Sequence, residues 1–371
     1  MSGSAHDAPD PVEEARKIEK YSYLLPEASA QLIDKMNSGT PPATGPDTAI
    51  AAAADARAAL PDPDWPALDA AAARDRARGC LLGLAVGDAV GAAVEFAARD
   101  SFPPLVDMIG GGPFHLAPGE WTDDTTMALC LADSLLESGT VDQDDLMTRL
   151  RGWLERGEMT VSGRCFDIGV TTRAAIERFA ATGVAAAGRE DGNTAGNGSL
   201  VRLAPLAIFA AGDAETAEFL AVKQSRATHA AQECLDACKL FVAFLLDALD
   251  GADKAGATRA RVMSLAPKLL FISAGEWKAK TRGEIRSSGY VVHTLEAALW
   301  AVWQTDTFRD AVLTAANLGD DADSVAAVAG QLAGALYGAS AIPAEWLAKL
   351  AWRDEIAQRV DALFDRNAAG R

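Results

Sequence analysis

Two clusters of carboxylates and hydroxyls are the groups in this sequence best suited to chemistry. They consist of Thr122, Asp123 and Asp124, and of Asp321, Asp323 and Ser324. Each stands directly before an expected helix, where a single acid usually caps the helix and complements its dipole. Several adjacent acids exceed what capping requires and repel one another unless a cation lies between them. Carboxylates and hydroxyls are ligands of Mg²⁺ and Mn²⁺, so the clusters together predict a metal site, with helix capping as the alternative.

A stripe of glycines spaced four residues apart accompanies two further acids. Gly83, Gly87 and Gly91 fall on one helix face and allow a neighbouring helix to approach closely. Asp88 and Glu95 lie in the same small, apolar stretch, where an isolated acid is unfavourable unless it is hydrogen-bonded, paired or metal-bound. Asp88 is most simply a buried hydrogen-bonding group, and Glu95 is the better catalytic candidate.

A glycine-rich segment at residues 192–202 is a candidate binding loop. It contains Gly196, Asn197, Gly198 and Ser199. The segment has no Gly-Lys-Ser/Thr, and Val201 stands where a dinucleotide fingerprint needs glycine. We expect a flexible turn leading into a helix, whose free amides and hydroxyl suit a pyrophosphate or a ribose. Such turns are also common in proteins that bind neither.

Isolated positions complete the candidates. Asp167 precedes an expected helix, and Gly289 with Tyr290 forms a second glycine-containing turn. Tyr290 is either an exposed stacking surface or a packing residue. A lone histidine such as His229 is more often a structural group than a functional one.

The elements that must position these residues are helices. Apolar residues recur at i, i+3, i+4 and i+7, and no run of strand length alternates β-branched or aromatic residues. The expected helices span residues 74–85, 126–138, 144–156, 171–182, 214–228, 230–250, 294–304, 308–317, 324–338 and 345–367. We therefore predict an all-α catalytic domain with long functional loops over residues 71–371.

Residues 1–70 differ in composition and are predicted to be an extension with a linker. Apolar spacing predicts short helices at 12–25 and 27–38, followed by a Pro-, Ala- and Asp-rich stretch at 40–66 with an Ala-rich, helix-compatible part at 49–60. Tyr and Leu on a short acidic helix are typical of partner anchors. The alternatives are a solvated tail, or an arm that folds on its own domain or fixes an oligomer.

Composition excludes several classes of function. The 371 residues contain 34 Lys+Arg and 52 Asp+Glu, a net charge of −18, so nucleic acid is not an expected partner. Five cysteines without a Cys-x-x-Cys pair and only four histidines argue against a disulfide framework and against thiolate or multi-histidine metal sites. The start lacks a signal peptide, and the uncharged, Ala- and Gly-rich stretch at 325–342 fits an internal helix. We expect a cytoplasmic protein with no membrane partner.

Taken in order, the motifs resemble the ADP-ribosylglycohydrolase family, which includes the dinitrogenase-reductase activating glycohydrolase and the eukaryotic ADP-ribosyl hydrolases. The resemblance covers residues 74–352 through Gly-Asp-x-x-Gly-x-x-x-Glu at 87–95, Thr-Asp-Asp-Thr at 122–125, Gly-Asn-Gly-Ser at 196–199 and Gly-Asp-Asp-Ala-Asp-Ser at 319–324. It implies an orthogonal helical bundle that binds two Mg²⁺ or Mn²⁺ ions through Thr122, Asp123, Asp124, Asp321, Asp323 and Ser324. Ser324 stands where the family usually has Thr and keeps the hydroxyl.

The resemblance also implies the reaction, which is hydrolysis of the glycosidic bond between ADP-ribose and a protein side chain. Glu95, Asp123 and Asp321 would be catalytic, with Glu95 or a metal-bridging Asp accepting the proton of the attacking water. ADP-ribose would be held by Gly196, Asn197, Gly198, Ser199, His229, Gly289 and Tyr290. Asp167 matches a position that meets the guanidinium in arginine-specific relatives, which favours arginine as the acceptor.

Other functions remain open on the same fold. One is a non-catalytic protein that binds ADP-ribose or a partner, and another is a structural protein, as in some crystallins of the family. ADP-ribose binding without turnover would favour the first of these. Some family members are immunity proteins against ADP-ribosylating toxins, so residues 1–70 are a candidate arm that occludes the NAD cleft of a toxin.

Overall fold

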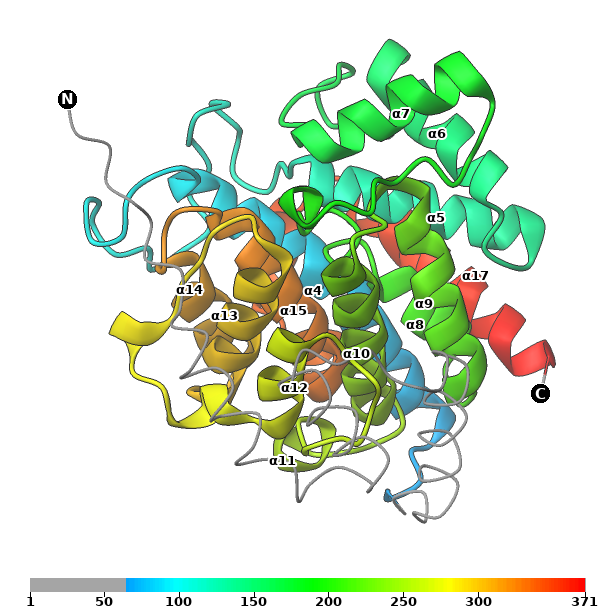
Figure 1. Ribbon diagram of the computed structural model, residues 1–371. Helices are drawn as coiled ribbons and strands as arrows, with labels where there is room; N and C mark the ends of the chain where they lie inside the picture. Colours follow the sequence, from blue (N-terminus) through cyan, green and yellow to red (C-terminus); the bar gives the residue numbers. More distant parts are fainter. Residues whose placement is uncertain (1–64, 371) are drawn as a thin grey trace, which may run out of the picture. The chain divides into compact units, whose positions relative to one another are not determined.

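A computed structural model describes residues 65–370 (Figure 1). Over this range the chain forms α-helices and short 3₁₀ turns, with no β-strand, which confirms the all-α prediction. The helices predicted at 12–25 and 27–38 and the Ala-rich part at 49–60 lie outside the described residues. The segment Arg259–Glu276, which carries helix α12 (Pro267–Ala274), belongs to a separate compact unit, within which Ser273 Oγ donates to Arg261 O at 2.8 Å.

The centre of the domain is the packing of α4 (Ala70–Gly91) against α15 (Ala322–Tyr337), the blue and orange helices in the middle of Figure 1. A Cβ added at Gly87 would lie 2.1 Å from Ala326 O, so only glycine permits this approach. The glycine stripe and the internal helix predicted near 325–342 are both confirmed. The stretch Ala70–Val94 is long and apolar enough to cross a membrane, but 89% of its most apolar window is buried inside the protein.

The other helices of this unit pack around the central pair, with α10, α13 and α14 against α15 and with α17 against α4. They are α5 (Asp123–Ser138), α6 (Gln143–Arg156), α7 (Val170–Thr182), α8 (Ala204–Phe209), α9 (Ala214–Thr228), α10 (Gln232–Leu249), α11 (Lys254–Ala257), α13 (Val291–Trp303), α14 (Phe308–Ala316), α16 (Ala344–Lys349) and α17 (Arg353–Gly370). Local sequence explains several boundaries. Asp142 caps α6, and glycines in the left-handed conformation end α5, α6 and α7.

The single helix predicted at 345–367 is wrong, because the chain breaks between α16 and α17. Trp352 adopts a positive φ of 57°, which interrupts the helical path. Contacts distant in sequence hold the break: Ala351 N donates to Gly119 O at 2.9 Å, and the ring of Trp121 meets that of Trp352 edge to face. Helical periodicity cannot reveal such a break.

Candidate active site

Most of the predicted site residues meet in one cavity of about 490 Å³. Those lining it are Glu95, Asp123, Asp124, Asp167, Gly196, Asn197, Gly198, His229, Gly289, Asp321, Asp323 and Ser324. The structure therefore joins both acidic clusters to the glycine-rich loop. Thr122, Ser199 and Tyr290 are not part of the lining.

Three of the four acids in the two clusters lie inside the first turns of two helices rather than before them, and the fourth, Asp321, is the N-cap of α15. Helix α5 begins at Asp123 and α15 at Ala322, three and two residues earlier than the expected starts at 126 and 324. Asp123, Asp124 and Asp323 consequently lie where the positive end of each helix dipole favours negative charge. Neither N-cap side chain, of Thr122 or of Asp321, bonds an amide of its own helix, so capping does not account for the clusters.

The start of α5 is capped by Asp88 from α4. This fully buried carboxylate accepts from Thr122 N and Oγ1 at 2.8 and 2.9 Å, and from Thr125 N and Oγ1 at 3.0 and 2.6 Å. Asp88 is thus the hydrogen-bonding group expected from the sequence. Thr122 Oγ1 also lies 3.1 Å from Asp323 Oδ2. Because a hydroxyl has one proton, donation to Asp88 leaves its lone pairs available to a cation beside Asp323.

Several carboxylate oxygens in the cavity have no partner. Glu95 Oε2, Asp124 Oδ2 and Asp323 Oδ1 are buried and without a hydrogen bond among the described residues. One oxygen each from Glu95, Asp321 and Asp323 lie within 4.8 Å of one another. Orphaned buried carboxylates are strongly unfavourable, and a hard divalent cation would satisfy them. The donor set fits such a metal.

Burial and mutual repulsion raise the pKa of these acids. Burial, with the charges of Asp167 and Asp321, raises the pKa of Glu95 to about 10. Burial likewise raises the pKa of Asp167 to about 7 and that of Asp321 to about 6. The pKa values of Asp123, Asp124 and Asp323 are also raised well above their usual range, chiefly by burial. Without a cation the cluster therefore retains protons near neutral pH.

Backbone pairing holds Glu95 beside the second acidic cluster. Phe96 N donates to Asp320 O at 2.7 Å, and Asp320 N donates to Ala97 O at 2.8 Å. Phe96 and Asp320 both adopt positive φ values, of 61° and 56°. Strained backbone of this kind persists only where surrounding contacts impose it, and here it aligns two acids from distant segments.

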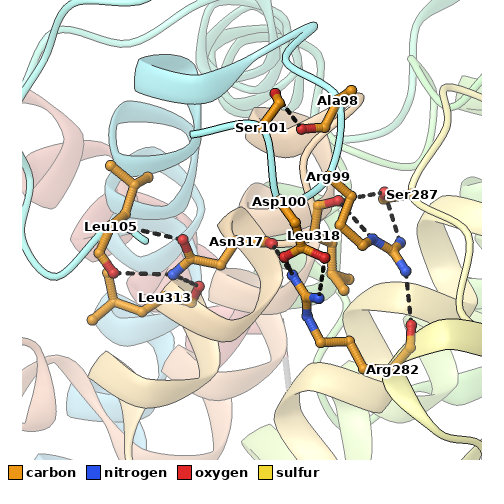
Figure 2. Close-up of polar contacts among 10 residues, drawn as sticks. All are labelled: Ala98, Arg99, Asp100, Ser101, Leu105, Arg282, Ser287, Leu313, Asn317 and Leu318. Carbon is orange, nitrogen blue, oxygen red and sulfur yellow. Dashed lines mark hydrogen bonds and ion pairs between the residues drawn. The ribbon is translucent and has the colours of Figure 1, made fainter. Parts of the chain in front are cut away.

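Figure 2 shows the polar contacts that support this junction. Arg99 donates to Leu318 O at 3.0 Å and to Ser287 Oγ at 3.2 Å. It also donates to the carbonyl of Arg282, whose guanidinium forms two hydrogen bonds to Asp100 at 2.8 and 2.9 Å. Sequence reasoning missed this clamp, because its members are ordinary charged residues separated by nearly two hundred positions.

The glycine-rich loop contacts the second glycine-containing turn and the acids. Asn197 N donates to Gly289 O at 3.1 Å, and its side-chain amide donates to Asp321 Oδ2 at 2.6 Å and to Thr294 Oγ1 at 2.9 Å. Gly196 forms an isolated antiparallel bridge with Tyr290. The loop thus couples directly to Asp321.

Two expectations about this loop need correction. Ser199 is fully buried, with its Oγ 2.8 Å from Ser225 Oγ and 3.5 Å from Cys238 Sγ, so the hydroxyl faces the core instead of a ligand. The loop also does not lead directly into a helix, since α8 begins only at Ala204. Tyr290 precedes α13 and contacts the ring of His293 edge to face, outside the cavity lining.

The mouth of the cavity has an apolar rim that the motifs did not identify. Phe96 and Val170 line it and are 66% and 86% exposed, and Phe166 lines it too. Phe114 contacts both phenylalanine rings. The available signal was the placement of Phe96 and Phe166 next to the acids Glu95 and Asp167.

Comparison with known proteins gives consistent results. The ADP-ribosylglycohydrolase family matches residues 69–371. The protein named ADP-ribosylarginine hydrolase Tri1 from Pseudomonas putida (strain GB-1) is 50% identical over 354 residues, covering 94% of this chain and 92% of that protein. The ADP-ribosyl-[dinitrogen reductase] glycohydrolase of Rhodospirillum rubrum is 36% identical, covering 78% of this chain and 96% of its own. A solved structure titled "ADP-ribosylglycohydrolase-related protein complex" matches with a TM-score of 0.72 and 43% identity, over 80% of this chain and 99% of that chain.

Proposed function

The chain belongs to the ADP-ribosylglycohydrolase family, and from this membership we propose that it hydrolyses the bond between ADP-ribose and a modified arginine side chain. The observation that carries the proposal is the group of unpartnered buried carboxylates at a cavity shared with a glycine-rich loop. The relatives named ADP-ribosylarginine hydrolase, each 50% identical, support arginine as the acceptor.

We propose that the site takes two divalent ions, with Mg²⁺ favoured and Mn²⁺ as the other candidate. The residues that would hold them are Thr122, Asp123, Asp124, Asp321, Asp323 and Ser324. When bound, such ions supply charge that orients ribose hydroxyls and lowers the pKa of water. The unpartnered oxygens of Asp124 and Asp323 support this assignment.

Residues of this chain carry out the proton transfer and the positioning of the reacting groups. Water adds to the anomeric carbon as the bond to the guanidino nitrogen breaks, and the electron pair remains on that nitrogen. The raised pKa of Glu95 would fall with divalent ions in the site. Glu95, buried at the cavity, would then accept the water's proton and pass it to the departing guanidine nitrogen. Asp123 and Asp321, at the N-terminal ends of α5 and α15, hold the water and the ribose in the orientation that the reaction needs.

Recognition of the acceptor and of ADP-ribose uses different residues of the lining. Asp167 is half-buried and lines the cavity, so its carboxylate is available to the planar guanidinium. The amides of Gly196 and Asn197 already donate within the protein, so the amide of Gly198, with His229, is the donor that this side of the loop offers to the nucleotide.

A release assay tests the proposal. Full-length protein is incubated with arginine-ADP-ribosylated protein and, in parallel, with a serine-linked substrate, and free ADP-ribose is measured with Mg²⁺, with Mn²⁺ and after EDTA. Release from the arginine substrate that depends on the metal is the expected result. Binding of ADP-ribose without release would instead support the non-catalytic alternative. For the Asp321→Asn change used below, Asp320→Asn is the matched control and should leave release unchanged. This neighbouring acid is exposed, lies outside the lining and has a positive φ that Asn tolerates.

We further propose that residues 1–70 bind an ADP-ribosyltransferase toxin in the cytoplasm and block its NAD cleft. The match to the Pseudomonas protein covers 94% of this chain and so includes most of residues 1–68, which precede the family match. In contrast, 78% of this chain already accounts for 96% of the Rhodospirillum protein. The extension therefore accompanies a relative named for arginine hydrolysis.

Two proteins test the extension. One is a full-length variant with Asp123→Asn and Asp321→Asn. The other is an active version that begins at Trp65; this residue is kept because its ring lies against Gly256. Inhibition of the transferase by the inactive full-length protein alone is expected. If that protein neither binds nor inhibits the transferase, the extension does not occlude it.

A further inference from the structure

A buried hydrogen-bond relay runs from Arg202 through Thr228 to His229. We propose that this relay holds His229 as the neutral tautomer with its proton on Nε2, so that the ring donates a hydrogen bond to the diphosphate of ADP-ribose. The identity of the ligand rests on the proposed function, whereas the relay itself rests on the contacts of this chain. Arg202 and Thr228 are positioning residues, because they act through His229.

The direction of the relay follows from the chemistry of its members. Arg202 Nη2 lies 2.9 Å from Thr228 Oγ1, which lies 2.8 Å from His229 Nδ1. A guanidinium only donates, so the threonine oxygen accepts from Arg202. The hydroxyl is fully buried, and among the described residues its other hydrogen-bond partner is His229 Nδ1, so its single proton is satisfied only if Nδ1 accepts it. The imidazole proton is therefore on Nε2.

The surroundings keep this imidazole neutral. All three residues of the relay are buried. Burial and the nearby charge of Arg202 lower the pKa of His229 to about 3, so the imidazolium form is absent at neutral pH. His229 can thus donate a hydrogen bond through Nε2, but it cannot serve as a general acid.

The Nε2 edge of His229 faces the cavity between the glycines of the binding loop. A Cβ added at Gly196 would lie 3.4 Å from Nε2, and one added at Gly198 would lie 2.9 Å from Cε1 and 3.3 Å from Nε2. Larger residues would therefore crowd this edge. Among the described residues Nε2 has no hydrogen-bond partner, while His229 lines the cavity.

The charge behind the relay favours an anionic ligand on this side. Arg202 donates to Gln224 Oε1 at 2.8 Å, to Gln224 O at 3.0 Å and to Thr228, and it approaches Met127 Sδ at 3.8 Å. No carboxylate in the described part of the chain contacts it. Burial lowers its pKa only to about 10, so the guanidinium keeps its charge. A cation with no counter-ion among the described residues lies one hydroxyl away from His229, and this matches a diphosphate better than an uncharged ribose.

A purely structural role for Arg202 is the competing explanation. Gln224 and Thr228 belong to the last turns of α9, and a guanidinium near a helix C-terminus stabilises the free carbonyls there. That role requires the bond to Gln224 O, but it does not require any particular tautomer of His229. The experiment must therefore measure the protonation of the two ring nitrogens of His229 directly.

The first measurement uses the unmodified full-length protein with ¹⁵N-labelled histidine. Long-range ¹H–¹⁵N correlation spectra identify the tautomer, and His229→Gln assigns the signal among the four histidines. We expect a protonated Nε2 and an unprotonated Nδ1, with Nε2 shifting on addition of ADP-ribose and Mg²⁺. A proton on Nδ1, or an imidazolium at neutral pH, would overturn the inference.

The second measurement is a double-mutant cycle on ADP-ribose affinity, measured by calorimetry with Mg²⁺. Thr228→Val keeps the shape but removes the hydroxyl, and it should weaken binding about tenfold, which corresponds to one hydrogen bond. Thr228→Ser should restore most of the affinity. In the His229→Ala background Thr228→Val should have almost no further effect. Equal losses in both backgrounds would show that Thr228 acts through folding, and the relay would be wrong. If native protein bound no ADP-ribose, the proposed function would fail, while the tautomer measurement would still decide the relay.

Discussion

Asn197 donates a 2.6 Å hydrogen bond from its side-chain amide to Asp321 Oδ2, so the glycine-rich loop and the second acidic cluster share one contact. A loop residue that contacts an acid of the proposed metal site cannot act on the nucleotide alone. Energetic effects of residues in direct contact are usually not additive. Binding of metal and binding of ADP-ribose should therefore be coupled through this pair.

Asn197→Ala tests that coupling. Considered from the sequence, a change in the loop should weaken ADP-ribose binding more than metal binding. The contact with Asp321 predicts that both affinities fall, each about tenfold, because a hydrogen bond to a charged group is lost. Calorimetric titrations with Mn²⁺ and with ADP-ribose measure the two losses. The matched control is Asn193→Ala, an exposed asparagine of the same segment, which should change neither.

Asp123→Asn and Asp321→Asn should each lower the rate of ADP-ribose release by about a hundredfold or more, since each removes a proposed metal ligand. Helical content should stay nearly unchanged, because neither side chain caps its own helix. Stabilisation by added metal, read from thermal unfolding, should disappear. Activity that survives both changes in chelator-treated protein would exclude the metal site.

The metal-free protein should become less stable as the pH rises from about 4 towards 7. The folded-state pKa values of Asp321 and Asp167 are raised from 3.8 to about 6 and about 7. The folded state therefore keeps protons that the unfolded state loses. The resulting stabilisation of the folded state is fully present below the unfolded pKa of 3.8 and is lost as the pH rises through about 6 and about 7. Urea unfolding with EDTA and with saturating Mg²⁺ isolates the effect, because acids elsewhere contribute equally to both series. The stabilisation by metal should increase with pH, and a stabilisation that stays flat or decreases would contradict the prediction.

Asp88→Asn should destabilise the protein by about 2–4 kcal/mol. Asp88 accepts from the amides and hydroxyls of Thr122 and Thr125, and the amide nitrogen of Asn would point donors at donors. The start of α5 would lose its cap, and the acids in its first turn would shift, so activity should also fall. Urea unfolding and the release assay measure the two effects. Unchanged stability would mean that the cap contributes little.

The sequence alone determined the parts of this protein that depend on local pattern. Helical periodicity identified most of the helices, and the glycine stripe containing Gly87 predicted the close approach of α4 to α15. The two acidic clusters could be recognised because adjacent like charges require an explanation wherever they lie. The order of the motifs identified the family, because each motif is short and contiguous.

Only the tertiary structure decided what each side chain contacts. Ser199 stands within a binding motif, yet packing turns its hydroxyl towards the core, and Asp88 caps a helix that begins 35 residues after it. Arg202 resembles any surface arginine in the sequence, but the fold buries it one hydroxyl away from His229, with no carboxylate partner among residues 65–370. The physical reason is that burial and hydrogen-bond partners depend on residues distant in the chain. Local spacing carries no information about them until the helices pack.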